Sequence, residues 1–486
     1  MYNAYITEIK NVRCHPNADR LDLVDCFGNT VCVSHGEFAE GDLAVYFPTD
    51  GQLSEEFCQV HDLVRRKDDA GNQCGGYLEP SKRNIRAIRL RGERSDGLAM
   101  PLRCLEYTGI DIRTLEAGFA FTTINGKEIC CKYIPRSNRR NQSCNAGNHT
   151  RKKKVPVAPL FAEHADTEQL AYNLSAFKPG DEIEITLKMH GTSGRTARLP
   201  VLKGYTDSFG CRAGNAIRHL LNKMGCYHGE DRHDGEPIYE DGYVSGTRRV
   251  VLEDYSGGFY GDNSFREKHS KIFEGKLHKG ETVYYEIVSF TDDGTPIMGR
   301  AKVPKEAQTE YGKEMVFHYG CNPEGEILKY GEDEHGTFAI PVKVPKNDMY
   351  VYRMTLTTDE GYVVEYTPDM MRHRCEEMGV KTVPLFEKFI IPHNEAELGL
   401  YHDHCEMPID AGEWVKMKAE KYYDGPDPIG KTHIREGVVV RIVNRPKFTA
   451  FKHKNFLFKQ ITGIITEQVA NSADVDKISD DILSEL

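Results

Sequence analysis

An alternation of apolar and polar side chains marks the most informative strand in this chain. Residues 182–187 read Glu-Ile-Glu-Ile-Thr-Leu. Such alternation predicts a half-buried strand, and it puts Glu184, Thr186 and Lys188 on one face. The turn at residues 191–194, Gly-Thr-Ser-Gly, follows at once. The pattern favours a lysine amine that points into a cleft, although a lysine before such a turn is equally ordinary hairpin chemistry.

Three later segments are also extended and apolar, and each carries charge. Residues 283–290 place Glu286 inside an aromatic strand. Residues 436–441 are a β-branched run, typical of a strand covered on both faces, with Glu436 at its entrance. In residues 451–456, period-2 spacing puts Lys452 and Lys454 on the same face. Two like charges there are unfavourable unless an anion lies between them. Each segment alone could still be a surface strand with solvated charges.

The first 125 residues show a different pattern, in which short predicted strands are separated by Gly, Asp and Pro turns. We expect strands near residues 30–34, 43–47 and 85–91, and this spacing predicts a small β-barrel. Arg86, Arg89 and Arg91 on the last strand are candidate phosphate contacts. They could equally decorate a solvated ribbon.

The barrel is followed by a polar, basic stretch that includes residues 136–154 and predicts a flexible linker. Its charge could also neutralise nucleic-acid phosphates. Residues 161–170 then predict a turn into a helix, with Asp166 or Thr167 as the N-cap. At the end of the chain, residues 467–486 predict an acidic helix with an imperfect apolar stripe, which we expect to pack on the core.

Composition limits the function without identifying it. The 486 residues suffice for two or more domains with substantial cores. A formal net charge of −11 argues against a general nucleic-acid coat, so any such contact must be made by local basic patches. Fourteen cysteines without a secretory leader or long apolar span predict reduced thiols in a soluble intracellular, cytoplasmic protein with no membrane segment.

The order of the charged strands resembles the motifs of the covalent nucleotidyltransferases, which include polynucleotide ligases and messenger RNA capping enzymes. The nucleophile motif is Lys-Met-His-Gly at 188–191, and its histidine, His190, is similar to RNA ligases, whereas DNA ligases and capping enzymes typically carry aspartate there. Five further matches follow, and the resemblance covers roughly residues 160 to 460. They are Glu286 at the third motif, the aromatic segment 349–354 beside it, Glu-Gly-x-x-x-Arg at 436–441, Lys-x-Lys at 452–454, and the short arginine motif at 245–249. Long insertions near 199–240, 300–345 and 367–430 depart from a compact ligase.

The resemblance implies a mechanism in which the Lys188 amine attacks the α-phosphorus of ATP and forms a lysyl-AMP adduct. Neighbouring cations favour the neutral amine that this attack needs. Lys452 and Lys454 would hold the α-phosphate, and Glu436 would hold Mg²⁺, or alternatively Mn²⁺, largely through its waters. The remaining implied roles are Glu286 on the ribose hydroxyls, Tyr352 or Tyr350 stacked on adenine, and Arg248 or Arg249 on the nucleotide or RNA ends.

A second resemblance lies at residues 15–25, which are similar to the opening strand of the tRNA-binding OB modules of aminoacyl-tRNA synthetases. OB folds commonly carry single strands or RNA across such a face. An OB domain before a nucleotidyltransferase core resembles one group of nick-sealing RNA ligases. The residues for attack on ATP all lie beyond Glu184, so deleting residues 1 to roughly 130 should spare lysyl-AMP formation and weaken nick sealing.

These observations together predict an α+β protein. Its parts would be an OB-fold RNA-binding β-barrel at 1–125, a basic linker at 126–160, and a nucleotidyltransferase domain of antiparallel sheets with flanking helices at 161–486. The expected function is ATP-dependent joining of RNA 3′-hydroxyl and 5′-phosphate ends, by a monomer acting on RNA ends or nicked duplex. Alternatives are DNA or mixed-strand sealing, capping-type guanylyl transfer, and a non-catalytic RNA-binding protein; the intact set of charged residues argues against the last.

Overall fold

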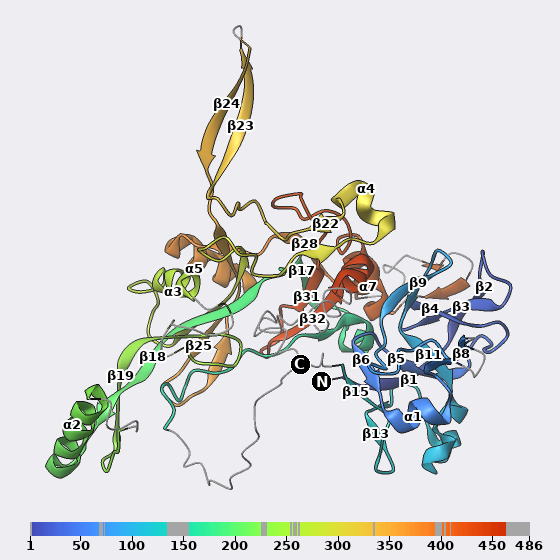
Figure 1. Cartoon of the computed structure of the whole chain (residues 1–486), viewed down its shortest axis with the longest axis horizontal. Helices are drawn as coiled ribbons and strands as arrows, with labels where there is room; N and C mark the ends of the chain where they lie inside the picture. The colour runs from blue at the N-terminus through green and yellow to red at the C-terminus, as the bar shows by residue number, and fades with distance from the viewer. Residues whose placement is uncertain are drawn as a thin grey trace.

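The structure, a computed structural model, describes residues 2–67, 71, 73–133, 155–224, 231–252, 255, 260, 263–333, 336–393, 401–402, 405–408 and 410–462. Two bodies are visible in Figure 1, one built from the N-terminal residues and one from residues 155 onward. The basic stretch 136–154 and the acidic C-terminal stretch 467–486 lie outside the described residues.

The first body is built from short antiparallel strands around two apolar clusters. One cluster centres on Ile6, Val45 and Phe47, and the other on Val24, Val31 and Tyr46. Its main sheet has the order β11-β5-β1-β12, and β2-β3-β4 forms a three-stranded sheet beside it. The main elements are β1 (Ala4–Glu8), β2 (Lys10–Cys14), β3 (Leu21–Cys26), β4 (Asn29–Ser34), β5 (Leu43–Phe47), β6 (Gly51–Leu53), α1 (Glu55–Val60), β7 (Arg65–Lys67), β8 (Gln73–Gly75), β9 (Ala87–Leu90), β10 (Glu93–Asp96), β11 (Leu98–Pro101) and β12 (Ala120–Phe121).

The first body extends beyond the boundary expected from the sequence. Strands β13 (Thr123–Ile124), β14 (Lys127–Glu128) and β15 (Cys130–Lys132) follow β12. Because β15 pairs with β6, from Cys130 opposite Leu53 to Lys132 opposite Gly51, residues up to 133 belong to this body. Local composition suggested a linker from residue 126, but the partner strand lies about 80 positions earlier and could not be seen locally.

The second body consists of two sheets with helices packed against them. The five-stranded sheet has the order β16-β32-β31-β17-β28, and the larger sheet has the order β19-β18-β20-β25-β26, with β27 beside β25. The strands are β16 (Glu168–Gln169), β17 (Glu182–Leu187), β18 (Thr192–Tyr205), β19 (Pro237–Gly246), β20 (Glu281–Ser289), β25 (Asn347–Thr357), β26 (Val363–Glu365), β27 (Lys381–Thr382), β28 (Leu385–Ile390), β31 (Gly437–Ile442) and β32 (Thr449–Lys454). The strands expected at 182–187, 283–290, 436–441 and 451–456 are therefore confirmed.

The five-stranded sheet buries one face and turns the other toward the larger sheet. Ile185, Val438 and Val440 pack with α7 (Ala411–Glu420) through Val415 and Ala419. The larger sheet forms a hydrophobic core together with apolar residues of α3 (Ser264–Lys271) and α5 (Pro368–Met378). The space between the sheets is therefore bounded by the second, more polar face of β17, β31 and β32.

The helix expected at residues 161–170 does not form. Its last residues make β16, where Glu168 pairs with Phe451 and Gln169 with Lys452, and a short 3-10 turn, Leu170–Tyr172, follows. Asp166 does not cap a helix, because its carboxylate accepts from Arg248 and Arg249. Backbone groups that would have formed hydrogen bonds within the expected helix instead pair with β32.

The segments expected to be insertions differ in how they join the fold. Residues 367–430 are integral, because α5 lies in the core and β28 pairs with β17. In contrast, β23 (Glu326–Asp333) and β24 (Gly336–Lys343) form a hairpin that rises from the body in Figure 1, and α2 (Phe209–Lys223) caps the end of the β18–β19 arm.

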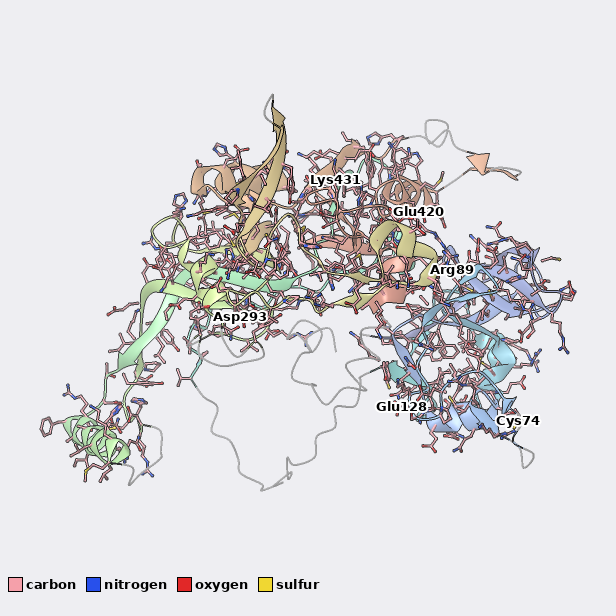
Figure 2. All side chains as sticks on the ribbon, turned by 45° about the horizontal axis from the view of Figure 1, so that its top comes forward. Cys74, Arg89, Glu128, Asp293, Glu420 and Lys431 are labelled. Atoms are coloured by element: carbon pink, nitrogen blue, oxygen red, sulfur yellow. The ribbon has the colours of Figure 1, made fainter. Side chains whose placement is uncertain are left out.

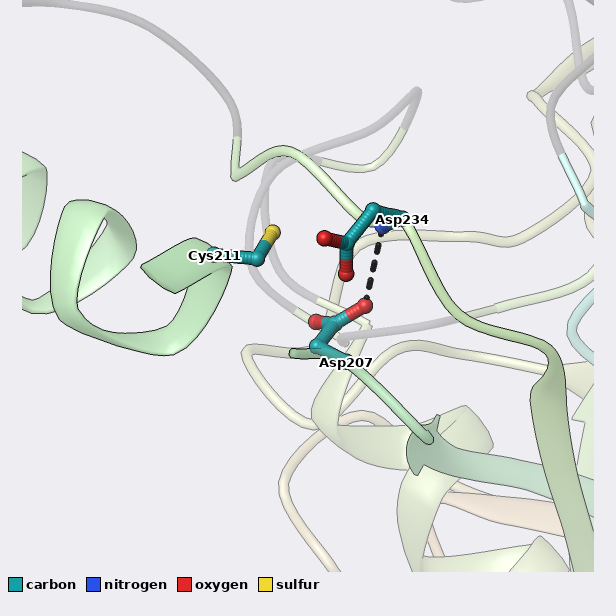
Figure 3. Close-up of side chains that lie close together, drawn as sticks. All are labelled: Asp207, Cys211 and Asp234. Carbon is teal, nitrogen blue, oxygen red and sulfur yellow. Dashed lines mark hydrogen bonds between the residues drawn. The ribbon is translucent and has the colours of Figure 1, made fainter. Parts of the chain in front are cut away.

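A polar network fastens α2 to its arm. Ser208 is the N-cap of α2 and accepts from the backbone of Cys211. Asp207 accepts from the backbone N–H of Asp234 at 3.0 Å, and the three side chains Asp207, Cys211 and Asp234 lie together in Figure 3. Asp234 in turn accepts from the Ser208 hydroxyl at 2.6 Å. The carboxylates thus satisfy polar groups at the helix start and join the two chains of the arm.

Direct contacts connect the two bodies. The Tyr172 ring, from the second body, stacks on Tyr5 of the first at 4.6 Å between centroids. Two ion pairs continue the interface: Lys459 Nζ lies 2.5 Å from Asp96 Oδ2, and Arg89 Nε lies 3.1 Å from Glu306 Oε1. Arg89, expected from the sequence as a candidate phosphate contact, therefore contacts the second body. Figure 2 shows Arg89 on the side of the first body that faces the second.

Candidate active site

A pocket opens between the two sheets of the second body. It is lined by the side chains of both sheets and of the segment that precedes β16. The principal lining residues are His164, Glu184, Thr186, Lys188, Arg248, Glu286, Tyr352, Val439, Arg441, Phe448 and Ala450. Four residues that lie far apart in the sequence, Lys188, Arg248, Glu286 and Tyr352, thus meet at one cavity.

The floor of this pocket follows the strand register. Across β17, β31 and β32, Thr186 pairs with Val439 and Val439 with Lys452. One row further along, Glu184 pairs with Arg441, and Arg441 with Ala450. Because side chains two residues apart share a face, these rows are about 6.6 Å apart. The floor therefore runs from a lysine-rich end at Lys188, through the row of Thr186, Val439 and Lys452, to the row of Glu184, Arg441 and Ala450.

Lys188 and Glu436 form the charged centre of the lysine-rich end. Lys188 Nζ lies 2.7 Å from Glu436 Oε1, and Lys454 Nζ lies 3.4 Å from the same oxygen. The backbone N–H of Lys188 donates to Gly437 O at 3.0 Å, so the two motifs are also joined through the main chain. The side chain of Lys188 is 17% exposed and that of Glu436 only 3%. The amine is accessible from the pocket while its partner is buried.

Glu436 is held as a carboxylate by the cations around it. Burial, the largest single influence, raises its pKa, but Lys188 and Lys454 together outweigh burial, so the pKa lies well below the usual range for glutamate. One oxygen has spare capacity: Oε2 is buried and has no hydrogen-bond partner among the described residues. His190 Nδ1 lies 3.4 Å away, too far for a strong hydrogen bond. An acceptor of this kind suits a water bound to a divalent cation.

His190 is fixed beside this carboxylate rather than beside the pocket. Its backbone N–H donates to the Tyr319 hydroxyl at 2.8 Å. Its ring meets Phe317 and Phe458 edge-on, at 4.6 and 4.7 Å between centroids. His190 is therefore placed beside Glu436, the carboxylate that pairs with Lys188.

Glu286 lies across the pocket from the nucleophile strand. In the ladder between β18 and β20 it pairs with Ser193, whose hydroxyl donates to Glu286 Oε2 at 3.4 Å. Ser193 lies five residues after Lys188, so the segment that follows the Lys-Met-His-Gly motif shares one rung of the larger sheet with Glu286. This carboxylate is positioned to accept hydrogen bonds from a ligand hydroxyl group in the cavity.

The structure separates the two tyrosines that the sequence left as alternatives. Tyr352 lines the pocket, whereas Tyr350 is 5% exposed within the core and donates to Asp348 Oδ2 at 3.2 Å. The ladder between β20 and β25 shifts register here, since Tyr284 pairs with Arg353 but Tyr285 pairs with Val351. Tyr352 is the extra residue at this irregularity, and β-bulges commonly redirect a side chain in this way.

Arg248 lies where this pocket meets a second one between the two bodies. The second pocket is lined by Tyr2, Tyr5, Asp50, Lys132, Asp166, Tyr172, Arg248, Lys452, Lys454 and Lys459, among others. Lys452 and Lys454 thus face the pocket between the two bodies. They lie next to the end of the first pocket that holds Lys188. Arg248 and Arg249 both pair with Asp166, at 3.0 and 3.2 Å, and the Arg248 side chain is the more buried of the two.

Sequence reasoning missed His164 and Phe448 as pocket residues. The His164 ring lies 5.2 Å from the rings of both Tyr284 and Tyr352, and Arg353 Nη1 lies 3.2 Å from its Nδ1. Burial first, and then nearby arginines, lower the pKa of His164 well below its ordinary value, so the ring is neutral at pH 7. No periodicity or motif marks either residue, and only the folded structure places them both in the lining of this pocket.

Comparisons with known proteins agree with this architecture. A family model described as an OB-fold domain matches residues 3–102. No curated protein matches the sequence. Among solved structures, the RNA ligase of Naegleria gruberi with PPi is 17% identical, with 93% of this chain and 96% of that chain covered and a TM-score of 0.50. A mutant of that ligase with AMP and Mn is 16% identical, with 94% and 98% covered and a TM-score of 0.50.

These similarities establish the fold. The chain is an α+β protein in which an N-terminal OB-fold barrel precedes a domain of sheets with flanking helices, the arrangement also found in the Naegleria structure. The similarity to the Naegleria ligase extends over both bodies. Within the described part of the chain, none of the helices has both the length and the apolarity needed to cross a membrane.

Proposed function

We propose that this protein is an ATP-dependent RNA ligase that joins RNA 3′-hydroxyl and 5′-phosphate ends in the repair of RNA nicks. One observation carries the proposal. The Lys188 amine reaches the charged end of a pocket whose other walls bring Glu286 and Tyr352 within the same cavity. A nucleotide bound there would present its phosphate to a nucleophile, its ribose to a carboxylate and its base to an aromatic ring.

The first step would be attack by the Lys188 amine on the α-phosphorus of ATP. A phosphorus–nitrogen bond forms, the bond to pyrophosphate breaks, and the amine proton leaves to solvent. Lys452 and Lys454, beside the nucleophile in the adjoining pocket, would neutralise the phosphates. Such transfers depend mainly on positioning and charge neutralisation, which are the two properties that this end of the pocket supplies.

Glu436 would hold a divalent cation, Mg²⁺ or Mn²⁺, through the oxygen that lacks a hydrogen-bond partner among the described residues. Magnesium dehydrates reluctantly and commonly keeps several of its waters, so a single buried carboxylate suffices as its protein anchor. When bound, the cation would offset negative charge on the phosphates. His190 and Lys454 would keep the carboxylate oriented toward it.

The next two steps would use the same phosphate end. An oxygen of an RNA 5′-phosphate would attack the adenylate phosphorus, which breaks the phosphorus–nitrogen bond, frees Lys188 and gives a 5′–5′ pyrophosphate. The RNA 3′-hydroxyl would then displace AMP and close the strand. Arg248, at the junction of the two pockets, is placed to contact the nucleotide or the RNA end.

The proposal is supported by the fold similarity to an RNA ligase whose solved forms include PPi, AMP and Mn. We further propose that the protein works as a cytoplasmic monomer on RNA ends or nicked duplex. Sealing of DNA or mixed strands and capping-type guanylyl transfer use the same first step, so they are distinguished by substrate rather than by the geometry of Lys188.

The test is a labelling assay followed by a sealing assay. The protein is incubated with α-labelled ATP or GTP, and the covalent adduct is measured on a denaturing gel; we expect an adduct with ATP and none with Lys188→Ala. Nicked duplexes of RNA, DNA and mixed composition are then compared. The Lys188→Ala variant should still seal pre-adenylylated RNA, because that step does not need the amine as nucleophile. Labelling of Lys188→Ala by ATP would overturn the assignment.

A further inference from the structure

The far end of the nucleotide pocket holds a buried ion pair that the proposed chemistry does not use. Glu184 is 3% exposed and lines the pocket. Its carboxylate accepts from Arg372 through both oxygens, at 2.9 and 2.8 Å. Arg372 lies on α5, which packs in the core of the larger sheet. A desolvated carboxylate at a cavity wall is unfavourable unless its remaining lone pairs find donors.

The position of Glu184 relative to Lys188 fixes which part of a nucleotide it would meet. The two residues are four apart on the same strand face, which corresponds to about 13 Å along the sheet. Thr186 and Val439 form the floor between them, and Tyr352 lines the same pocket. If Lys188 meets the phosphate, the ribose and base extend along this floor, and the far edge of the base reaches Glu184.

We propose that Glu184, held in place by Arg372, is a specificity-determining residue that recognises the amino edge of adenine. The inference rests on the proposed function, because it takes the pocket to bind a purine nucleotide with its phosphate at Lys188. A carboxylate accepts hydrogen bonds and cannot donate them. It therefore pairs with the exocyclic amine of adenine and repels the carbonyl oxygen that guanine and hypoxanthine carry at the same position.

The neighbouring Arg441 would have the opposite preference, because a guanidinium donates to a carbonyl. One of its nitrogens is engaged by protein acceptors: Nη2 donates to Tyr366 O at 2.9 Å and lies 3.7 Å from Glu365 Oε2. The guanidinium also lies over the Phe448 ring at 5.1 Å. Arg441 therefore supports the pocket wall, and the recognition of the base edge is assigned to Glu184.

The first test uses the unmodified protein and a series of nucleoside triphosphates. We compare ATP, the purine nucleotide that lacks a 6-substituent, and inosine triphosphate, and we measure kcat/KM for formation of the covalent adduct. Loss of a hydrogen bond to a charged acceptor should lower kcat/KM about ten- to a hundredfold for the unsubstituted purine, and the 6-oxo purine should be poorer still. Equal use of all three nucleotides would overturn the proposal.

The second test is Glu184→Gln, which keeps the shape and adds an amide donor. The ratio of kcat/KM for ATP to that for inosine triphosphate should fall at least tenfold in this variant. The matched control is Glu281→Gln, because Glu281 is also buried and is held by Arg374 of the same helix, at 2.9 Å to each oxygen, on the larger sheet. Glu281→Gln should leave the ratio unchanged.

The outcomes separate this inference from the proposed function. If the wild-type protein forms no adduct with any nucleotide, the proposed function fails. If it forms the adduct but Glu184→Gln keeps the wild-type ratio, only the role of Glu184 fails. A wild-type preference for the 6-oxo purine would reassign the base edge to Arg441. If Glu184→Gln does not fold, the nucleotide series on the wild-type protein still decides the question.

Discussion

At the scale of single residues, Glu436 pairs with both Lys188 and Lys454. Because its Oε2 is buried without a hydrogen-bond partner among the described residues, we expect Glu436→Ala to lose bound metal. Adduct formation by Glu436→Ala should fall sharply at limiting magnesium and recover in part when magnesium is raised. The measurement is the rate of adduct formation over a magnesium titration. Wild-type behaviour at limiting magnesium would remove the metal role from Glu436.

The same carboxylate should make stability depend on pH. Its pKa in the folded protein lies below the ordinary glutamate value of about 4.3, since Lys188 and Lys454 outweigh the effect of burial. The stabilisation is therefore fully present above that value and is lost as the pH falls, because the unfolded chain then binds a proton that the folded protein does not. The difference in unfolding free energy between wild type and Glu436→Gln should shrink from about pH 6 to about pH 3, by at most about 1.4 kcal/mol per pH unit. A difference that stays constant with pH would contradict this.

Tyr352 and Tyr350 provide a matched pair, since only Tyr352 lines the pocket. Stacking of a base on an aromatic ring contributes about 1–3 kcal/mol. We therefore expect Tyr352→Ala to raise the KM for ATP in adduct formation about tenfold or more. Tyr350→Phe removes only the hydroxyl that donates to Asp348 and should leave the KM near wild type. The opposite pattern would place the base against the other tyrosine.

At the scale of elements, the nucleophile strand and the larger sheet approach each other at Gly191. A Cβ at this position would lie 2.3 Å from the backbone oxygen of Ile287 on β20, which cannot move without displacing the strand. Gly191→Ala should therefore destabilise the fold by about 1–3 kcal/mol and slow adduct formation. Gly204→Ala, in β18, is the control, because a Cβ there meets nothing within 4 Å. Thermal unfolding of both variants decides the point, and equal stability would show that the strands can separate.

At the scale of the whole molecule, the first pocket is built by the second body alone, whereas the second pocket is shared by both bodies. Loosening the interface should therefore affect RNA positioning more than attack on ATP. The double variant Arg89→Ala with Asp96→Asn removes the partners of Glu306 and Lys459. We expect adduct formation within a few-fold of wild type and nick sealing reduced by up to about 100-fold, as expected for a misplaced reacting end.

The control for the interface variant is Arg113→Ala with Asp111→Asn, an exposed ion pair within the first body whose partners are 3.8 Å apart. Exposed pairs contribute little to stability, so this control should match wild type in both assays. Single-turnover adduct formation and nick sealing are measured on each protein. Equal loss of both activities in the interface variant would show that the first body also serves the attack on ATP.

Local sequence was sufficient for the strands that carry the chemistry. The alternation at residues 182–187 predicted β17, and the β-branched run at 436–441 predicted β31. The side-chain period of a strand is a local property, so it could be read before any partner strand was known. The motif order also brought Lys188, Glu286 and Tyr352 to the same expected site, and the structure places all three at one pocket.

Features that depend on pairing between strands far apart in the sequence were decided only by the tertiary structure. The register shift opposite Tyr284 and Tyr285 chose Tyr352 over Tyr350, and pairing with β32 turned residues 168–169 into a strand where a helix was expected. Pairing with β6 likewise drew residues 130–132 into the first body. In each case the local pattern allows more than one outcome, and the choice is made by backbone hydrogen bonds to residues that are adjacent only in the folded chain.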